Sequence, residues 1–199
     1  MTIEERTDEF LARLRAGEGE VLGELFELHR QRLWAMLSVR LDRRLLGRTS
    51  ADDVLQETFL DVARRVGEHL AAPAVPFYVW LRFLALQRLQ MVQRAHLGPE
   101  RDAGKEARSD SMAGQFAGQL TSPSQAAIRH ELQDRLRAAL DRMEETDREV
   151  LAMRHFEEMS NNEVAEALGL TKSAATKRYT RALVELRRVL GDLTDPFVR

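Results

Sequence analysis

Apolar residues recur at helical spacing along most of the chain and predict an all-α protein. Residues at i, i+3, i+4 and i+7 share one face of a helix, and an apolar face of this kind is expected to be buried. Glycine or proline follows several of the periodic segments and is expected to end them. The pattern predicts helices over residues 8–16, 20–46, 51–66, 77–97 and 172–190, with shorter helices between residues 124 and 168.

The periodicity is lost between residues 98 and 123. This stretch is rich in glycine, serine, alanine and charged residues, a composition typical of a flexible linker that forms at most one weak helical turn. We therefore expect two small helical bundles, residues 1–97 and residues 124–192, joined by this linker.

At three of the expected helix starts a serine or threonine stands three positions before an acid, the pattern of a capping box. In this arrangement each side chain bonds a backbone N–H of the other residue, and a helix begins there. The pattern predicts helix starts at three places, which are Ser50 with Asp53, Thr146 with Glu149 and Ser160 with Glu163.

Two helix starts near the C-terminus are joined by a tight corner. Ala165 is small enough for two helices to cross closely, Gly169 can adopt the left-handed conformation that ends the first helix, and Thr171 can cap the second. Ala175 gives the second helix a small apolar anchor. The inner stripe of that helix is predicted as Tyr179, Leu183, Leu186 and Leu190. This spacing predicts a helix-turn-helix, in the C-terminal bundle.

The second helix of this corner carries a surplus of positive charge. From residue 172 to residue 190 there are six bases and one acid. The exposed start of such a helix suits phosphates and base edges in a DNA major groove. A helical hairpin whose charges are merely solvated is the alternative, and the corner favours DNA binding.

Charge elsewhere in the chain is arranged differently. The net charge is −2, but residues 1–27 carry eight acids and three bases. The chain has no cysteine, and its five histidines are scattered, so disulfides and a metal site are not expected. Without a signal peptide or a long apolar run, we expect a soluble, cytoplasmic protein.

No pattern of catalytic or cofactor chemistry occurs in the sequence. There is no glycine-rich phosphate loop and no recognisable pair of nucleophile and base. We therefore expect neither catalytic residues nor a cofactor.

Two segments of the N-terminal bundle suit binding. Asp52, Asp53, Gln56 and Glu57 share an exposed side near the start of one helix, where acids also favour the helix dipole. The helix over residues 77–97 mixes arginines, amides and aromatic residues, as a single-stranded nucleic acid requires. Its aromatic and leucine residues at helical spacing also suit a core, so this second segment is ambiguous.

Two motifs on either side of the linker resemble a known family. Residues 53–59, DVLQETF, are similar to the D-[VA]-x-Q-[ED]-x-F signature of bacterial extracytoplasmic function sigma factors. Residues 146–154, TDREVLAMR, followed by the helix-turn-helix, resemble their promoter-binding C-terminal region. The resemblance covers about residues 10–190, excluding the linker.

The resemblance implies partners and roles for particular residues. Core RNA polymerase, through its β′ and β subunits, would dock on Asp52, Asp53, Gln56 and Glu57. The loop over residues 70–76 and the following helix would open the promoter −10 element, with contacts from Tyr78, Arg82, Gln87, Arg88, Gln90 and Arg94. The −35 element would be read as duplex DNA by Thr171, Lys172, Ser173, Thr176, Lys177, Arg178, Thr180 and Arg181.

Four residues depart from the family pattern. Gln87 and Gln90 replace the usual asparagine and aspartate of the −10 helix, and Ala174 and Ala175 replace the usual threonine and valine of the recognition helix. A sigma-like protein that binds polymerase without reading promoters therefore stays open. So does a helix-turn-helix regulator that binds a palindromic operator as a dimer. The sequence leaves open whether an anti-sigma factor is a further partner.

Overall fold

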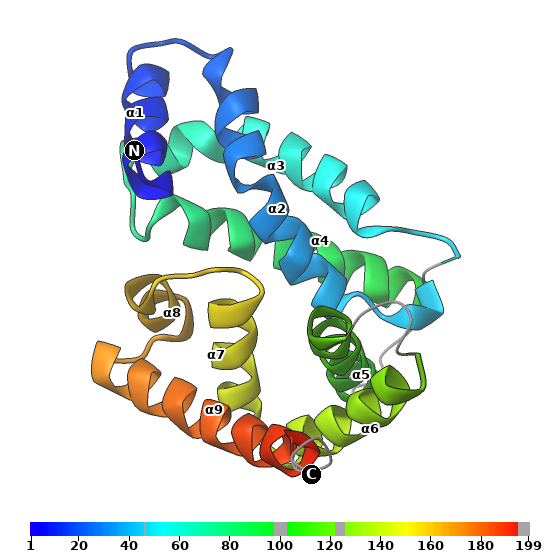
Figure 1. Ribbon diagram of the computed structural model, residues 1–199. Helices are drawn as coiled ribbons and strands as arrows, with labels where there is room; N and C mark the ends of the chain where they lie inside the picture. The colour runs from blue at the N-terminus through cyan, green and yellow to red at the C-terminus, as the bar shows by residue number, and fades with distance from the viewer. Residues whose placement is uncertain (46, 98–102, 122–125, 195–199) are drawn as a thin grey trace. The chain divides into compact units, whose positions relative to one another are not determined.

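All regular secondary structure in the described part of the chain is helical. The computed structural model in Figure 1 describes residues 1–45, 47–97, 103–121 and 126–194. These residues form nine α-helices and one short 3₁₀ helix and no strand, which confirms the predicted all-α class. The chain divides into an N-terminal unit, Met1–Leu37 with Arg44–Gly98, and a C-terminal unit, Ser38–Arg43 with Pro99–Arg199.

The N-terminal unit is built on four helices: α1 (Ile3–Arg15), α2 (Val21–Arg40), α3 (Ala51–Ala71) and α4 (Phe77–Leu97). The last turn of α2, from Ser38 on, belongs to the C-terminal unit. A 3₁₀ helix, η1 (Arg43–Leu45), follows α2, where the sequence predicted one continuous helix. Helices α3 and α4 pack against each other. The fully buried leucines that form the core come from α2, η1, α3 and α4: Leu25, Leu33, Leu37, Leu45, Leu55, Leu81 and Leu84.

Two predictions in the N-terminal unit are wrong. Helix α3 continues through Gly67 and ends at Ala71, because one exposed glycine weakens a helix without breaking it. The break comes at Ala72, which precedes Pro73, since proline disfavours the helical conformation of the residue before it. Helical spacing places Trp34 with Leu33 and Leu37 on the apolar side of α2, and burial of Trp34 is the second wrong expectation, because 45% of its surface is exposed.

The C-terminal unit contains α5 (Ala103–Leu120), α6 (Ala126–Arg142), α7 (Glu145–His155), α8 (Asn161–Leu168) and α9 (Lys172–Thr194). Helices α7, α8 and α9 pack on one another, and α6 also contacts α9. Their buried residues are Leu136, Leu140, Val150, Leu151, Met153, Val164, Ala175, Ala182 and Leu186. Leu183, predicted for the inner stripe, is 40% exposed, because the stripe follows residues 175, 182 and 186.

Helix α5 overturns the prediction of a flexible linker for residues 103–120. It packs against α6, and Met112, Ala113, Phe116 and Ala117 are buried. The Phe116 ring lies 4.7 Å, centroid to centroid, from that of Phe156, the residue that follows α7. The hydrophobic pattern does not reveal α5, because its many alanine and glycine residues give only a weak apolar periodicity. The same small residues let α5 and its neighbours approach closely. Residues 98–102 and 122–125 of the predicted linker lie outside the described residues.

The capping box predicted at Thr146 and Glu149 does not form. Helix α7 begins at Glu145, and its N-cap, Glu144, makes no side-chain capping hydrogen bond. The Glu149 carboxylate instead accepts a hydrogen bond from Arg40, whose side chain is only 3% exposed and also pairs with buried Glu157 at 2.8 Å. A buried arginine needs such partners, because an isolated buried charge is costly.

Candidate docking and nucleic-acid interfaces

The helix-turn-helix corner forms as the sequence predicts. Ser160 and Glu163 make the complete capping box of α8, with hydrogen bonds of 2.7 and 3.2 Å. Gly169 ends α8 in the left-handed conformation, with φ of 61°. The Thr171 hydroxyl then accepts a hydrogen bond from the backbone N–H of Ala174 at 3.1 Å, so it caps α9.

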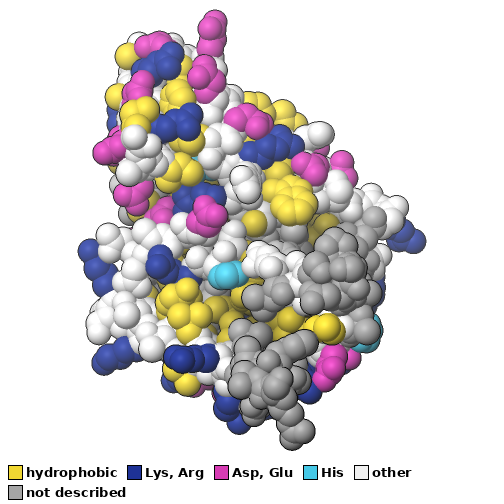
Figure 2. Space-filling view, in the orientation of Figure 1, with side chains coloured by type: hydrophobic (Ala, Val, Ile, Leu, Met, Phe, Trp, Pro, Cys, Tyr) yellow, Lys and Arg dark blue, Asp and Glu magenta, His cyan; other side chains and the backbone are white. Residues whose placement is uncertain are grey.

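The start of α9 presents a polar surface. Ala175 is fully buried, which fixes the helix against the unit. The exposed predicted contacts are Thr171, Lys172, Ser173, Thr176, Lys177, Thr180 and Arg181. In Figure 2 acidic side chains gather around α1 and the start of α2, whereas the side chains seen over α8 and the first half of α9 are basic or uncharged.

Two of the predicted −35 contacts are already ion-paired within the unit. Arg178 donates to Asp147 and to Glu144, at 2.9 Å in each case. Arg181 donates through Nε and Nη2 to the two oxygens of Asp147, and through Nη2 to Glu144 at 3.1 Å. The hydrogen bonds that both arginines donate to Asp147 raise their pKa. Sequence reasoning missed Asp147 because its partners lie 31 and 34 residues away.

The predicted docking residues on α3 are all exposed. Asp52 accepts hydrogen bonds from Arg30 at 2.9 Å and from the Trp34 indole at 3.3 Å. Asp53 is the capping-box acid of α3 and accepts from the backbone N–H of Ser50 at 2.8 Å, as the sequence predicts. Hydrogen bonds from the side chain and backbone of Ser50 lower the pKa of Asp53.

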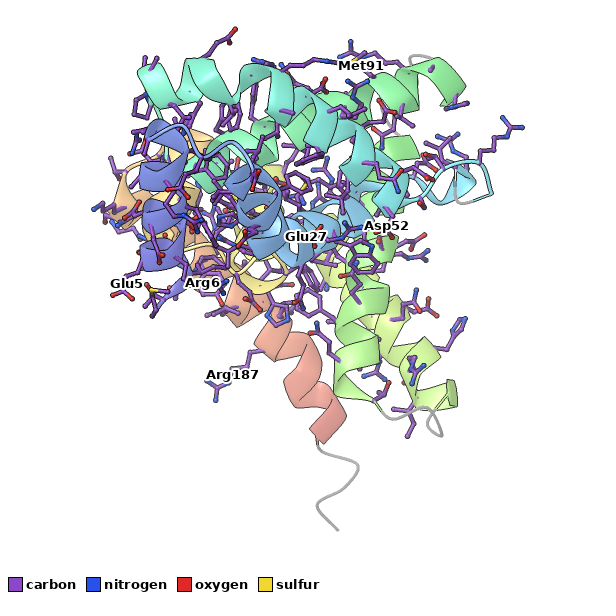
Figure 3. The ribbon with its side chains drawn as sticks, turned by 90° about the horizontal axis from the view of Figure 1, so that it is seen from above. Glu5, Arg6, Glu27, Asp52, Met91 and Arg187 are labelled. Atoms are coloured by element: carbon purple, nitrogen blue, oxygen red, sulfur yellow. The ribbon has the colours of Figure 1, made fainter. Side chains whose placement is uncertain are left out.

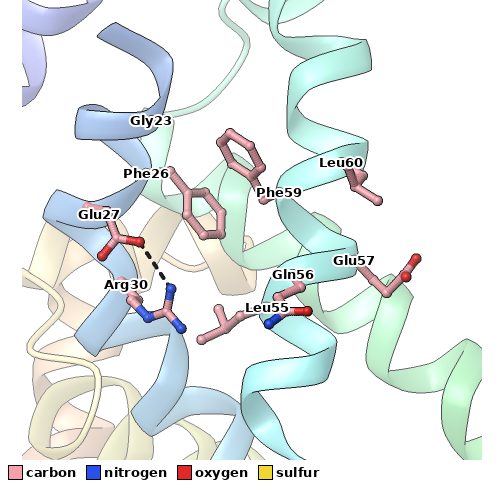
Figure 4. Close-up of a pocket in the computed structure, with 9 residues that line it drawn as sticks. All are labelled: Gly23, Phe26, Glu27, Arg30, Leu55, Gln56, Glu57, Phe59 and Leu60. Atoms are coloured by element: carbon pink, nitrogen blue, oxygen red, sulfur yellow. Dashed lines mark hydrogen bonds and ion pairs between the residues drawn. The ribbon is translucent and has the colours of Figure 1, made fainter. Parts of the chain in front are cut away.

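A groove of about 470 Å³ lies between α2 and α3, beside this acidic face. The rings of Phe26 and Phe59 meet edge to face in it, 5.1 Å apart between centroids. Figure 4 shows both rings and Leu55 lining the groove, with charged and amide groups around them. We call it the α2–α3 groove; its lining residues are Gly23, Phe26, Glu27, Arg30, Leu55, Gln56, Glu57, Phe59 and Leu60. The sequence pattern assigned Phe26 and Phe59 to the core and gave no sign of a hollow.

Helix α4 buries two of its predicted −10 contacts. Tyr78 is 2% exposed and Arg82 is 5% exposed. The guanidinium carbon of Arg32 lies 3.6 Å from the centroid of the Tyr78 ring. Residues 78, 82, 85 and 89 share one helical face, and this spacing could have revealed the burial of Arg82. These two side chains are therefore not presented to a ligand on the described surface.

A third predicted −10 contact connects two helices. Arg88 donates two hydrogen bonds to Asp61 on α3, one of them at 3.0 Å. Its Nη1 also lies 3.7 Å from Oε2 of Glu57, a docking residue. Arg88 thus holds α4 against α3.

The outer face of α4 carries the remaining candidates. Gln87, Gln90 and Arg94 are exposed, and Arg94 donates to Gln90 at 3.3 Å. Phe83 and Met91, which sequence reasoning did not select, lie on the same face with exposed fractions of 52% and 56%. Met91 points away from the ribbon in Figure 3. An unburied phenylalanine on a helix was detectable from its position outside the inner stripe.

Two further observations limit the chemistry of the described residues. No group of three or more potential metal-ligating side chains that could hold an ion occurs among them. No helix in the described part of the chain has the length and apolar character needed to cross a membrane.

Comparison with known proteins agrees with this geometry. A family model for sigma-70 region 4 matches residues 133–186, which include α7, α8 and the first half of α9. RNA polymerase sigma factor CarQ of Myxococcus xanthus is 27% identical over 183 residues, which cover 92% of this chain and 97% of CarQ. RNA polymerase sigma factor CnrH of Cupriavidus metallidurans is 31% identical over 144 residues, covering 71% of this chain and 74% of CnrH.

A solved structure is similar in fold. A chain from the structure of CnrH in complex with the cytosolic domain of CnrY matches with a TM-score of 0.56 and 24% identity, over 92% of this chain and 96% of that one.

The corner and the basic helix define a DNA-binding protein of the helix-turn-helix class. The similarity to CnrH, CarQ and region 4 is more specific: the chain belongs to the bacterial extracytoplasmic function sigma factors of RNA polymerase. It is a sigma subunit that directs promoter-specific transcription. Members of this family are in general not enzymes.

Proposed function

We propose that the two units of this sigma subunit divide promoter recognition between them. The N-terminal unit docks on core polymerase and engages the opened −10 element, while the C-terminal unit reads the −35 element as duplex DNA. The observation that carries the proposal is the helix-turn-helix corner, which exposes the start of α9 with its lysines and hydroxyl groups. A helix start of this kind can enter a major groove.

Docking is assigned to the α2–α3 groove together with Asp52, Gln56 and Glu57. Exposed acids beside an apolar groove suit a basic helix that also brings apolar side chains. The β′ and β subunits of core polymerase are the proposed partners. Asp53 contributes by starting α3, because its carboxylate is bonded to Ser50.

The −10 contacts are assigned to the exposed face of α4. Phe83 and Met91 offer apolar surface to an unpaired base, while Gln87 and Gln90 offer hydrogen-bond donors and acceptors. Arg94 can follow the phosphates. Tyr78, Arg82 and Arg88 support this helix from within instead of touching DNA.

Further expectations concern the location, the chemistry and the partners of the protein. We place the protein in the cytoplasm with polymerase, and we assign it no cofactor and no catalytic step. An anti-sigma protein is a proposed partner, because the structural neighbour CnrH was solved with the cytosolic domain of CnrY.

The test is run-off transcription with core polymerase on a library of genomic promoters. The proposal expects initiation at a defined set of promoters that depends on this chain. Co-elution with core polymerase but no initiation on any promoter would instead support a sigma-like protein without promoter recognition. Binding of a palindromic site as a dimer, with no binding to core polymerase, would support the ordinary helix-turn-helix regulator.

A further inference from the structure

We propose that Asp147 is a positioning residue that neutralises Arg178 and Arg181 and thereby lowers the attraction of α9 for phosphates of any sequence. The inference rests on the proposed role of α9 as the reader of duplex DNA. It makes Asp147, which lies on α7, a determinant of specificity although it does not touch the DNA.

Asp147 is placed to hold both arginines. Its side chain is 5% exposed, whereas those of Arg178 and Arg181 are 29% and 56% exposed. One carboxylate oxygen accepts from Arg178 at 2.9 Å and from Arg181 at 2.8 Å, and the other accepts from Nε of Arg181. A two-pronged bond of this kind fixes the plane of a guanidinium group.

The cluster carries no net charge. Glu144, on the exposed side, accepts from Arg178 at 2.9 Å and from Arg181 at 3.1 Å, so two acids balance two arginines. Burial raises the pKa of Asp147, but hydrogen bonds from Arg181 and Arg178 outweigh burial and hold that pKa below its ordinary value. Asp147 is therefore ionised at neutral pH.

The lysines of the same helix differ in this respect. Lys172 and Lys177 are exposed, and neither forms an ion pair with another residue in the described part of the chain. Attraction between protein cations and DNA phosphates is independent of sequence and depends on salt, because bound phosphates release counterions. Lys172 and Lys177 therefore supply the salt-dependent part of binding. Arg178 and Arg181 supply directed N–H groups with little surplus charge.

The experiment compares two DNA duplexes by fluorescence anisotropy at several salt concentrations. One duplex is selected from a random library by the wild-type chain bound to core polymerase, and the other is a scrambled duplex of the same length. Asp147→Asn keeps the shape of the side chain and removes its charge. Glu185→Gln is the matched control, because Glu185 is an acid of α9 that lies outside the cluster and pairs with Arg188 at 3.1 Å.

Asp147→Asn is expected to raise affinity for the scrambled duplex about threefold to tenfold at low salt and to steepen the salt dependence by about one unit. Affinity for the selected duplex should rise less, so the ratio between the two duplexes falls. The gain should vanish when Arg181→Gln is added, because it comes from the released guanidinium. Glu185→Gln should leave the ratio unchanged.

Several results would overturn the proposal. One is an unchanged ratio between the affinities for the two duplexes in Asp147→Asn. Another is a gain in affinity for the scrambled duplex that persists when Arg181→Gln is added. A third is an equal fall of the affinity ratio in Glu185→Gln. If Asp147→Asn does not fold, exposed Arg181→Gln alone decides: it should change the salt slope by less than half as much as Lys177→Gln, and an equal change refutes the neutralisation. A wild-type chain that does not distinguish the two duplexes would instead contradict the function proposed for α9.

Discussion

The α2–α3 groove and the start of α9, the two proposed binding surfaces, are built in opposite ways. The groove is a hollow in which Phe26 and Phe59 meet, with acids around them. The start of α9 is a convex, polar helix end whose arginines are neutralised and whose lysines are exposed. Apolar burial is insensitive to salt, whereas contacts between lysines and phosphates weaken as salt rises. Binding to polymerase should therefore keep an apolar part that does not weaken as salt rises, beside the attraction between its acids and a basic partner, which does.

This difference also determines which substitutions should weaken binding most. In the groove, a charge placed against a partner surface of the same sign loses attraction and leaves desolvated charges unpaired. On α9, removal of one exposed lysine loses one phosphate contact and leaves no unpaired charge buried in the interface. The predictions below are ordered from the largest expected effect to the smallest.

The largest effect is expected for charge reversal beside the groove. Gln56→Arg with Glu57→Arg should weaken binding to core polymerase by about 2–4 kcal/mol, since both residues line the groove and both are exposed. We avoid Asp53, because its substitution would also remove the cap of α3. Titration against labelled core polymerase, repeated at high salt, measures the loss.

The matched control is Glu68→Arg, an exposed position near the other end of α3. It repeats one charge change on the same helix and should leave binding unchanged. An equal loss in this control would mean that net charge, and not the groove, governs docking.

Acid should destabilise the N-terminal unit through His29. This residue is 2% exposed and bonds the Thr7 hydroxyl at 2.9 Å. Burial, helped by Arg32, lowers its pKa from 6.5 to about 3. Between about pH 6.5 and pH 3, His29 is therefore protonated in the unfolded chain but neutral in the folded chain. The free energy of unfolding is at its full value above about pH 6.5 and falls as the pH decreases. The loss at pH 5 should be about 2 kcal/mol.

Urea unfolding at a series of pH values measures this effect. His29→Gln should reduce the loss between pH 7 and pH 5, although it also lowers stability at neutral pH. The exposed His96→Gln should retain the loss. An unchanged pH dependence in His29→Gln would contradict the assignment.

One helical glycine in each unit gives the smallest effect. A Cβ added at Gly67 in α3 or Gly118 in α5 would meet no atom within 4 Å. Alanine at either position should raise the unfolding free energy by about 0.5–1 kcal/mol, because it favours a helix over the unfolded chain. No gain at Gly118 would mean that this segment is not helical in solution. The measurement is urea unfolding of each single variant.

Gly67 and Gly118 lie in the two helical segments that the sequence did not predict correctly. Hydrophobic periodicity found the helices whose inner faces are made of leucine, and the capping boxes at Ser50 and Ser160 located two helix starts. It failed where packing relies on alanine and glycine, as in α5, because small side chains give a weak periodic pattern. It also failed at Gly67, since the packing of α3 carries the helix past one unfavourable residue.

The binding surfaces were predictable to a similar extent. Motifs and local charge selected the exposed residues of α3 and α9. They misplaced Tyr78 and Arg82, whose burial the helical spacing of residues 78, 82, 85 and 89 could have revealed. They could not reveal that Asp147 neutralises Arg178 and Arg181, because that depends on which residues distant in sequence lie opposite one another. The hollow between Phe26 and Phe59 has the same origin, because it exists only when α2 and α3 are side by side.

One measurement tests the division of labour most directly. Lys177→Ala and Phe83→Ala, each bound to core polymerase, are compared by fluorescence anisotropy on a duplex −35 fragment and on a pre-melted −10 fragment. Lys177→Ala should weaken only the duplex fragment and lower its salt slope by about one unit. Phe83→Ala should spare the duplex and weaken the pre-melted fragment by about 1–3 kcal/mol, through lost stacking. If both variants weaken both fragments equally, the two units do not divide promoter recognition as proposed.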